Sequence, residues 1–272
     1  VRDASGAPLE IVLAMPGGPV TVRAWVAQVG RVPLYLLDTN VPANRPEDRD
    51  ITRVLYGGDL EMRLRQEIVL GKGGVRLLRA LGIQPSVCHL NEGHAALTCL
   101  ERISELLKDA GLTFDEAREV VRATTVFTTH TPIAAGHDRF PPDVLRRYFA
   151  DAESWTGLPW ERFCRLGERP DDPGLFNMTG LALGLARFVN GVSVMHQGVS
   201  QELLQGFWPG RLAHEIPIRA ITNGIHLPTW TNRDLAALLS GGDRAVTGDD
   251  FARTGESLDD GELWRVRLRM RE

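Results

Sequence analysis

The sequence predicts an α/β fold built on a parallel β-sheet. Short apolar segments typical of strands are separated by segments with helical periodicity, and this alternation is typical of βαβ units. Polar residues, including several histidines, follow directly after four of the predicted strands. Because ligands bind beyond the carboxyl ends of the strands in an open parallel sheet, the second pattern predicts one functional cleft.

The first elements are three predicted strands, Leu9–Ala14, Val20–Ala27 and Pro33–Leu37. A helical period then runs over Leu60–Leu81, although Gly71, Gly73 and Gly74 lie within it. Each of these glycines costs roughly 1 kcal/mol of helix stability relative to alanine. We therefore expect either a close neighbour against that face of the helix or a break in the helix.

The middle of the chain continues the alternation of strands and helices. Strands are predicted at Ser86–Leu90 and Thr125–Thr128. One helix between them ends near Gly111, because glycine favours the end of a helix. A second helix begins at a capping box that runs from Thr113 to Glu116.

The last part of the chain predicts more strands and then a change in composition. The predicted elements are a helix at Met178–Val189, a strand at Val192–Met195 and a strand at Ile218–Ile221. Residues 240–261 are rich in Gly and Asp and predict a linker, and a charged helix follows at 262–272. We expect residues 1–239 to belong to one domain, and residues 240–272 to form the linker and first helix towards another.

The composition excludes several classes of protein. The 272 residues carry 31 basic and 35 acidic side chains, and a net charge of −4 argues against a nucleic-acid-binding protein. The longest weakly polar run, Pro173–Ala186, is too short to span a membrane. Three cysteines without a CxxC pair favour reduced thiols, which is typical of a cytoplasmic protein.

The polar residues at the strand ends indicate a sugar as ligand. They lie at Asn91–His94, His130–Thr131, His196 and Asn223–His226. Amide, carboxylate and imidazole groups match the many hydroxyls of a sugar, and an absent hydroxyl would leave such groups unpaired. A metal hydrolase with His89, Glu92, His94 and His130 as ligands is an alternative, but this spacing does not place two histidines on one helical face.

At these residues the sequence resembles the α-glucan (glycogen/maltodextrin) phosphorylases. The short motifs NEGH, THTPIAAG and TNGIH are similar to those of the bacterial and archaeal branch. The matching stretches follow the order of the family: Arg53–Asp59, Glu61–Glu67, His89–Leu97, Phe127–Pro141, Asn177–Thr179, Val189–His196 and Ile221–Trp230.

The resemblance implies the N-terminal half of a glycosyltransferase-B fold, with a Rossmann-like sheet. It implies phosphorolysis of terminal α-1,4-glucosyl units of glycogen or maltodextrin by inorganic phosphate, giving α-glucose 1-phosphate. It further implies that pyridoxal phosphate is bound to a lysine of the C-terminal half, where its phosphate assists the reaction. That lysine is not in this chain, whose only lysines are Lys72 and Lys108, both expected to be solvated helix residues.

The same resemblance assigns roles to individual residues. His130 matches the histidine that contacts the glucosyl unit near its 6-hydroxyl and is the expected catalytic residue, with Thr131 beside it on the loop. Asn91, Glu92 and His94 match the loop at the entrance to the active site, where the animal enzymes carry Asp instead of Glu92. The motif around Asn223, Gly224 and His226 lies near the domain junction, and direct contacts are less expected there.

The chain lacks an initiator Met and a cofactor domain, so we expect an internal fragment of the N-terminal domain that is inactive by itself. The expected partners are the glucan, phosphate or glucose 1-phosphate, the C-terminal domain of the same polypeptide, and a second copy if the protein forms a homo-oligomer. Two alternatives stay open from the sequence. One is a glycogen or starch synthase that uses a nucleotide sugar, and the other is a glucan-binding segment without catalysis.

Overall fold

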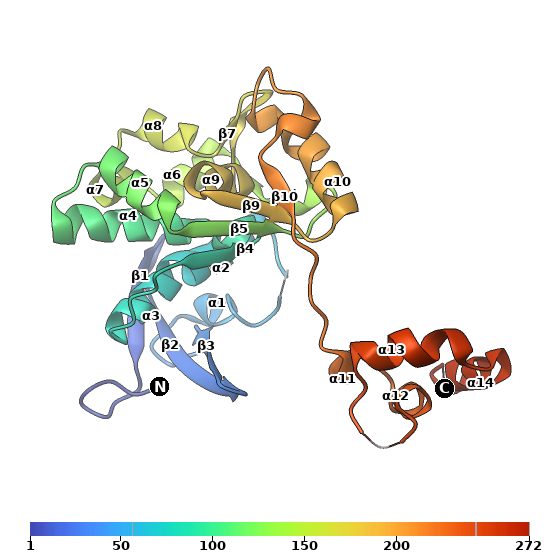
Figure 1. Ribbon diagram of the computed structural model, residues 1–272. Coiled ribbons are helices and arrows are strands. Elements are labelled where there is room, and N and C mark those ends of the chain that lie inside the picture. The colour runs from blue at the N-terminus through green and yellow to red at the C-terminus, as the bar shows by residue number, and fades with distance from the viewer. Residues whose placement is uncertain (56, 243, 272) are drawn as a thin grey trace. The chain divides into compact units, whose positions relative to one another are not determined.

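The computed structural model describes residues 1–55, 57–242 and 244–271, so Tyr56, Asp243 and Glu272 lie outside the described residues. The chain divides into two units, Val1–Thr222 and Asn223–Glu272, which are described separately (Figure 1). Among the described residues, no helix combines the length and the apolar character that crossing a membrane requires.

A four-stranded parallel sheet is the centre of the first unit. Its strands, in spatial order, are β10 (Ile218–Ala220), β9 (Phe188–Gly191), β5 (Thr125–Thr129) and β4 (Cys88–Asn91). In this register Asn91 pairs with Thr128, and Thr128 pairs with Asn190. All four carboxyl ends therefore lie at one edge of the sheet. The predicted α/β fold with a Rossmann-like parallel sheet is confirmed.

Helices of the βαβ units cover this sheet. They are α4 (Leu97–Ala110), α5 (Phe114–Ala123), α9 (Met178–Leu185) and α10 (Val194–Leu204). The predicted capping box of Thr113 and Glu116 is present, and Gly111 ends α4 in the left-handed conformation with φ 65°. The core between sheet and helices includes the fully buried Phe127 and Leu100. Figure 1 shows α5 and α9 on one side of the sheet and α2 and α3 on the other.

An antiparallel sheet stands beside the parallel one. It is formed by β1 (Glu10–Met15), β2 (Gly18–Val29) and β3 (Val32–Asp38), as the sequence predicts. Alternate residues of β1 and β2, such as Leu13 and Val22, are buried in the core. A short helix, α1 (Pro46–Arg49), follows this sheet.

The glycine-containing helix is not broken, and the other expectation, a close neighbour, is confirmed. It consists of α2 (Leu60–Ile68), a π-helical turn η1 (Val69–Gly73) and α3 (Gly74–Ala80). A Cβ atom on Gly71 would lie 2.6 Å from Leu97 Cβ and 2.9 Å from Thr98 N, so α4 approaches this turn closely. Only glycine fits between these two helices without displacing one of them.

Lys72, which lies in the π-helical turn, is buried, and the prediction of a solvated lysine there was wrong. Its Nζ lies 3.7 Å from the centre of the Trp155 ring, and it also faces Phe149. Burial lowers the pKa of Lys72 to about 8. Cation–π contact with two aromatic rings replaces part of the hydration of the ammonium group. Lys108 is exposed near the end of α4, as predicted.

The excursion between β5 and β9 holds short elements around an aromatic cluster of Phe149, Trp155 and Phe163. Its helices are α6 (Pro142–Tyr148), α7 (Ala152–Thr156) and α8 (Trp160–Arg165). Its small sheet consists of β6 (Arg139–Phe140), β8 (Asp172–Asn177) and β7 (Glu168–Arg169). The 3-10 turns of the first unit are η2 (Gly93–Ala95), η3 (Ala134–Gly136), η4 (Gln205–Phe207) and η5 (Ala213–Glu215).

The predicted boundaries between residues 178 and 195 were wrong. Helix α9 ends at Leu185 and β9 follows, whereas the predicted strand at Val192–Met195 falls on the start of α10. Ser193 caps α10, because its side chain accepts a hydrogen bond from His196 N–H at 3.0 Å. The capping serine ends the strand before the apolar residues that the prediction assigned to it.

The second unit is helical. It contains α11 (Leu227–Trp230), α12 (Arg233–Ser240), α13 (Gly248–Thr254), η6 (Gly255–Ser257) and α14 (Asp260–Arg269). Helix α13 lies in the stretch predicted as a linker, and a capping box of Thr247 and Asp250 begins it. The terminal helix is confirmed in α14. The assignment of residues 1–239 and 240–272 to parts of two domains stays a prediction.

Candidate functional site

Glu92 joins the loop after β4 to the loop after β5. Its Oε1 accepts hydrogen bonds from the backbone N–H of His130 and, at 3.2 Å, from the hydroxyl of Thr131. Its Oε2 lies 3.4 Å from the hydroxyl of Thr129, and His130 Nδ1 lies 3.7 Å from Oε1. One carboxylate therefore fixes the path of the chain as it leaves β5.

The backbone of Glu92 is strained. With φ 67° and ψ 172°, it is the one residue other than glycine with a positive φ among the described residues. This region of backbone conformation is populated almost only by glycine and costs about 1–3 kcal/mol for other residues. The strain turns the Glu92 carboxylate towards the neighbouring loop, and the Glu92 N–H still bonds Thr128 O at 3.0 Å.

Gly93 brings the same loop against the start of α9. A Cβ atom on Gly93 would lie 2.7 Å from Thr179 Oγ1 and 2.8 Å from Thr179 N. Thr179 also contacts His137 Nδ1 at 2.8 Å, and Met178 N–H donates to Asp138 O at 3.1 Å. The loops after β4 and β5 and the N-terminus of α9 thus form one packed group.

A chain of side-chain hydrogen bonds crosses three strands beneath these loops. His89 Nε2 lies 2.6 Å from Thr128 Oγ1, which donates to Asn190 Oδ1 at 2.8 Å. Because the Thr128 hydroxyl gives its proton to Asn190, His89 Nε2 is the donor in the first contact. This chain of bonds links β4, β5 and β9 near their carboxyl ends.

The structure brings together some of the predicted site residues and separates others. Glu92, His130 and Thr131 meet at the carboxyl edge of the sheet, with the His130 side chain 40% exposed. Asn91 is exposed at the end of β4. His94 instead lines a cavity on the α2 side, where burial and then the charge of Arg63 lower its pKa.

The other two strand ends contribute differently. His196 does not follow a strand, since it lies in the first turn of α10 and its Nδ1 accepts a hydrogen bond from Val192 N–H at 3.3 Å. Residues 223–226 belong to the second unit, where His226 Nδ1 contacts Thr229 Oγ1 at 2.7 Å. Of the strand ends that were predicted to form one cleft, the structure therefore brings together those of β4 and β5.

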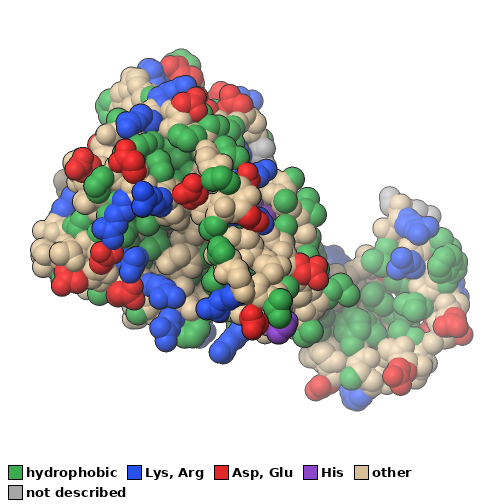
Figure 2. Space-filling view, turned by 90° about the horizontal axis from the view of Figure 1, so that it is seen from above, with side chains coloured by type: hydrophobic (Ala, Val, Ile, Leu, Met, Phe, Trp, Pro, Cys, Tyr) green, Lys and Arg blue, Asp and Glu red, His purple; other side chains and the backbone are tan. Residues whose placement is uncertain are grey.

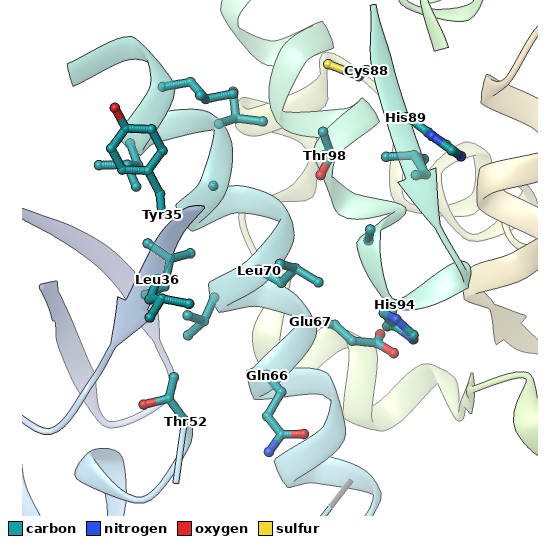
Figure 3. Close-up of a pocket in the computed structure, with 18 of the residues that line it drawn as sticks. Tyr35, Leu36, Thr52, Gln66, Glu67, Leu70, Cys88, His89, His94 and Thr98 are labelled. Carbon is teal, nitrogen blue, oxygen red and sulfur yellow. The ribbon is translucent and has the colours of Figure 1, made fainter. Parts of the chain in front are cut away.

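Several residues beside the site had no role in the sequence analysis. Arg63 Nη2 donates to Asp138 Oδ2 at 2.8 Å and so ties α2 to the loop after β5. Glu67 lies one helical turn further on and is 1% exposed, and it interacts with the carboxyl group of Asp138 through both charge and a side-chain hydrogen bond. Figure 3 shows the Glu67 side chain extending from α2 towards His94.

Glu67→Gln is expected to stabilise the chain at neutral pH. Burial, followed by the charge of Asp138, raises the pKa of Glu67 well above its usual value. A raised folded-state pKa means that wild-type stability falls as the pH rises above about 4.5, because the unfolded carboxyl ionises first. Glutamine does not ionise. Urea unfolding should therefore show a gain for the variant that grows from pH 4.5 to pH 7.5, and an equal gain at both pH values would contradict this.

Figure 2 shows basic and acidic side chains interspersed among hydrophobic ones on the face in view. Within the part of the chain that the structure describes, no group of three or more His, Cys, Asp or Glu side chains is arranged to hold a metal ion.

Comparison with known proteins finds relatives that match this chain from end to end. Glycogen phosphorylase of Mycobacterium tuberculosis is 44% identical over 289 residues, which include all of this chain and 33% of the relative. Maltodextrin phosphorylase of Thermococcus litoralis is 44% identical over 97% of this chain and 32% of its own length. Glycogen phosphorylase of Aquifex aeolicus is 38% identical over all of this chain and 40% of its own. No protein-family model matches the chain.

The chain thus spans about a third of the length of the first of these relatives. The matched region holds the loop with Glu92 and the loop with His130, because the match extends over the whole chain.

Proposed function

This chain is related over its whole length to the α-glucan phosphorylases, and we propose that it forms the sugar-binding side of the active-site cleft in such an enzyme. The reaction is phosphorolysis of the terminal α-1,4-glucosyl unit of glycogen or maltodextrin, with inorganic phosphate as acceptor and α-glucose 1-phosphate as product. The observation that supports this role most directly is the Glu92 carboxylate, which holds the backbone at His130 and the hydroxyl of Thr131.

The proposed sugar contacts come from fixed polar groups. Glu92 anchors the N–H of His130, and Pro132 restricts the backbone of Thr131. Carbonyl groups held in this way accept a sugar hydroxyl without the cost of ordering the loop during binding. The exposed ring of His130 and the exposed end of β4 at Asn91 supply further hydrogen-bonding groups. We propose that His94 acts from behind this loop rather than as a direct contact.

Pyridoxal phosphate, the cofactor that the family implies, does not fit the lysines of this chain. Lys72 is packed between α4 and the aromatic rings of Trp155 and Phe149, and Lys108 is exposed to solvent near the end of α4. We therefore propose that residues outside this chain bind the cofactor.

We also propose that the enzyme is cytoplasmic. Its reaction needs a further region, which corresponds to the part of the relatives that this chain does not match. Catalytic groups from two sides of a cleft act together only when their relative geometry is fixed. A chain that supplies one side alone lacks the rate gain that this fixed geometry gives. Expressed alone, the chain is expected to bind glucan without turnover. We further propose that the complete polypeptide forms a homo-oligomer, and sedimentation tests this.

His130→Ala in the complete polypeptide is expected to weaken recognition of the glucosyl 6-hydroxyl. The variant keeps the backbone carbonyl and loses the ring. A buried hydroxyl without a partner costs roughly 1–3 kcal/mol, or about 5- to 150-fold in kcat/KM. The test compares glucose 1-phosphate with its 6-deoxy analogue in the synthetic direction. Wild type should discriminate between the two substrates more strongly than the variant does.

The exposed His214 of η5 offers a matched control. His214→Ala should discriminate like the wild type. Equal discrimination by wild type and His130→Ala would place the His130 ring away from the 6-hydroxyl and would contradict the role proposed for this residue.

A further inference from the structure

The loop that follows β5 is held at both of its ends by carboxyl groups. At its start, Glu92 accepts the hydrogen bonds of His130 and Thr131. At its end, Asp138 Oδ2 accepts a hydrogen bond from Arg63 Nη2 at 2.8 Å, which ties the loop to α2. The position of the loop therefore depends on Asp138 as well as on Glu92.

The two ends of this loop also pack against each other. A Cβ atom on Gly136 would lie 2.3 Å from Thr131 Cγ2, so the chain can pass this close to Thr131 because residue 136 is glycine. His137 is buried next to Asp138, and its Nδ1 lies 2.8 Å from Thr179 Oγ1. A displacement of Asp138 would thus reach Thr131 through the closely packed segment between them.

Glu67 contacts Asp138 from the interior of the protein. It lies one turn after Arg63 on α2, so both side chains lie on the same face of the helix, and it is 1% exposed. Its carboxyl group makes a side-chain hydrogen bond with the carboxyl group of Asp138. Among the described residues, no N–H or hydroxyl group donates to the Glu67 oxygens. A hydrogen bond between two carboxyl groups requires a proton on one of them, because an ionised carboxylate can only accept.

The surroundings place this proton on Glu67. The Asp138 side chain is partly exposed and forms an ion pair with Arg63, which favours its charged form. Glu67 is buried, and burial followed by the charge of Asp138 raises its pKa well above the usual value. Where two carboxyl groups share one site, ionisation of the first opposes ionisation of the second.

The other groups around this pair leave the assignment unchanged. The titratable and charged side chains that line the cavity or form the carboxyl pair are those of Arg63, Glu67, Cys88, His89, His94 and Asp138. Burial lowers the pKa of His94, and it also lowers the pKa of His137 beside the pair, so both rings are neutral at neutral pH. The charges that act on Glu67 are those of Asp138 and Arg63.

We propose that Glu67 is a positioning residue that carries a proton at neutral pH, donates it in a hydrogen bond to Asp138 and so holds the end of the loop that begins at His130. Glu67 acts only through Asp138. When Glu67 ionises, its proton passes to solvent, the hydrogen bond is lost, and two adjacent carboxylates repel each other. The end of the loop is then released, and the proposed sugar contacts lose their fixed geometry. Only this last consequence rests on the proposed function.

Infrared difference spectroscopy of the complete polypeptide measures the protonation state. The spectrum of the wild type minus that of Glu67→Gln at pH 7 should contain the carbonyl band of one protonated carboxyl group. The band should disappear at alkaline pH, because a raised pKa means that the proton is lost only as the pH rises through it. A carboxylate band at pH 7 in its place would show that Glu67 is ionised and would overturn the proposal.

Glu101 offers a matched control, since it is also a buried helix residue. It accepts hydrogen bonds from Arg76 Nε at 2.6 Å and from Trp155 Nε1 at 2.7 Å. N–H donors of this kind favour an ionised carboxylate. The difference spectrum for Glu101→Gln should therefore lack the protonated band. The same band for both residues would show that it reports burial rather than the carboxyl pair, and would contradict the assignment.

Backbone hydrogen exchange tests whether the loop depends on this bond, and it needs no substrate. Glutamine at position 67 keeps a hydrogen-bond donor, whereas methionine fills a similar space without one. The peptide with residues 130–138 should exchange about tenfold faster in Glu67→Met than in the wild type, and within about twofold of the wild type in Glu67→Gln. Equal exchange in all three proteins, or an equal increase in both variants, would overturn the proposal.

Kinetics of the complete polypeptide separates positioning from folding. Glu67→Met should lower kcat/KM for phosphorolysis about tenfold. It should melt no lower than the wild type, because an apolar side chain replaces a buried polar one. Glu67→Gln should keep kcat/KM within about twofold at pH 7 and lose less of it than the wild type at alkaline pH. A parallel loss of activity and melting temperature in Glu67→Met would make the role structural and contradict the proposal. If the wild type forms no glucose 1-phosphate, the proposed function fails, while the infrared and exchange results still decide the role of Glu67.

Discussion

Replacing Glu92 by alanine is expected to lower kcat/KM of the complete polypeptide for glucan phosphorolysis by about 100-fold, because small displacements of positioning groups have effects of this size. The carboxylate of Glu92 accepts hydrogen bonds from the His130 N–H and the Thr131 hydroxyl. Without it the backbone at His130 is free to move, and the proposed sugar contacts lose their fixed geometry. Steady-state kinetics with maltoheptaose and phosphate measures the effect.

The strained backbone of Glu92 supplies a control that separates its two roles. Glu92→Gly relieves the strain at φ 67°, whereas Glu92→Ala keeps it. The glycine variant should therefore be more stable than the alanine variant by about 1–3 kcal/mol in urea unfolding. Both variants should lose activity to a similar extent, since both lack the carboxylate. A glycine variant with full activity would show that Glu92 shapes the chain but does not hold the loop.

Gly71→Ala is expected to destabilise the chain by about 2 kcal/mol, because an added methyl group overpacks a filled contact. The new Cβ would meet Leu97 Cβ at 2.6 Å and the backbone nitrogen of Thr98 at 2.9 Å, and backbone atoms cannot yield as a flexible side chain can. Urea unfolding of the 272-residue chain, followed by circular dichroism, measures the change in the free energy of unfolding.

Gly74 is the matched control for this prediction. It lies in the same helix, and a Cβ atom there would meet nothing within 4 Å. Gly74→Ala should therefore stabilise the chain by about 1 kcal/mol, the ordinary advantage of alanine in a helix. The two substitutions should have opposite signs. A stabilising effect of both would mean that α4 does not approach the π-helical turn at Gly71.

The sequence predicts the positions of β4 and β5 and of the polar loops after them, because strong local signals mark both strands. Each is a short apolar run that ends in polar residues, and a capping box and a left-handed glycine mark the helices between them. The parallel arrangement then requires Glu92 and His130 to meet at one edge. Local chemistry and topology agree at this point, so the core of the candidate site can be derived from the sequence.

The boundaries near β9 do not follow from the sequence, because apolar residues continue on both sides of Arg187 and Asn190, from α9 into α10. Nothing in its periodicity separates the end of a buried helix at Leu185 from a buried strand at Phe188. Ser193 caps α10 and so fixes where this helix begins. This role can be recognised only once the position of α10 is known.

Burial of charged residues was the other feature that the sequence could not reveal. Lys72 and Glu67 both lie on a helix with an apolar face, where charged residues are normally expected to be solvated. Lys72 is buried because Trp155, from a distant part of the chain, covers it. Glu67 is buried beside a cavity whose walls come from three separate segments. Such contacts depend on tertiary packing and leave no local signal.

We propose that this chain supplies the sugar-binding side of an α-glucan phosphorylase. The most direct measurement is the product that the complete polypeptide forms from maltoheptaose in the presence and absence of inorganic phosphate. The complete polypeptide should form α-glucose 1-phosphate only with phosphate, and the 272-residue chain alone should show no turnover. Release of free glucose without phosphate, or chain elongation that requires a nucleotide sugar, would contradict it.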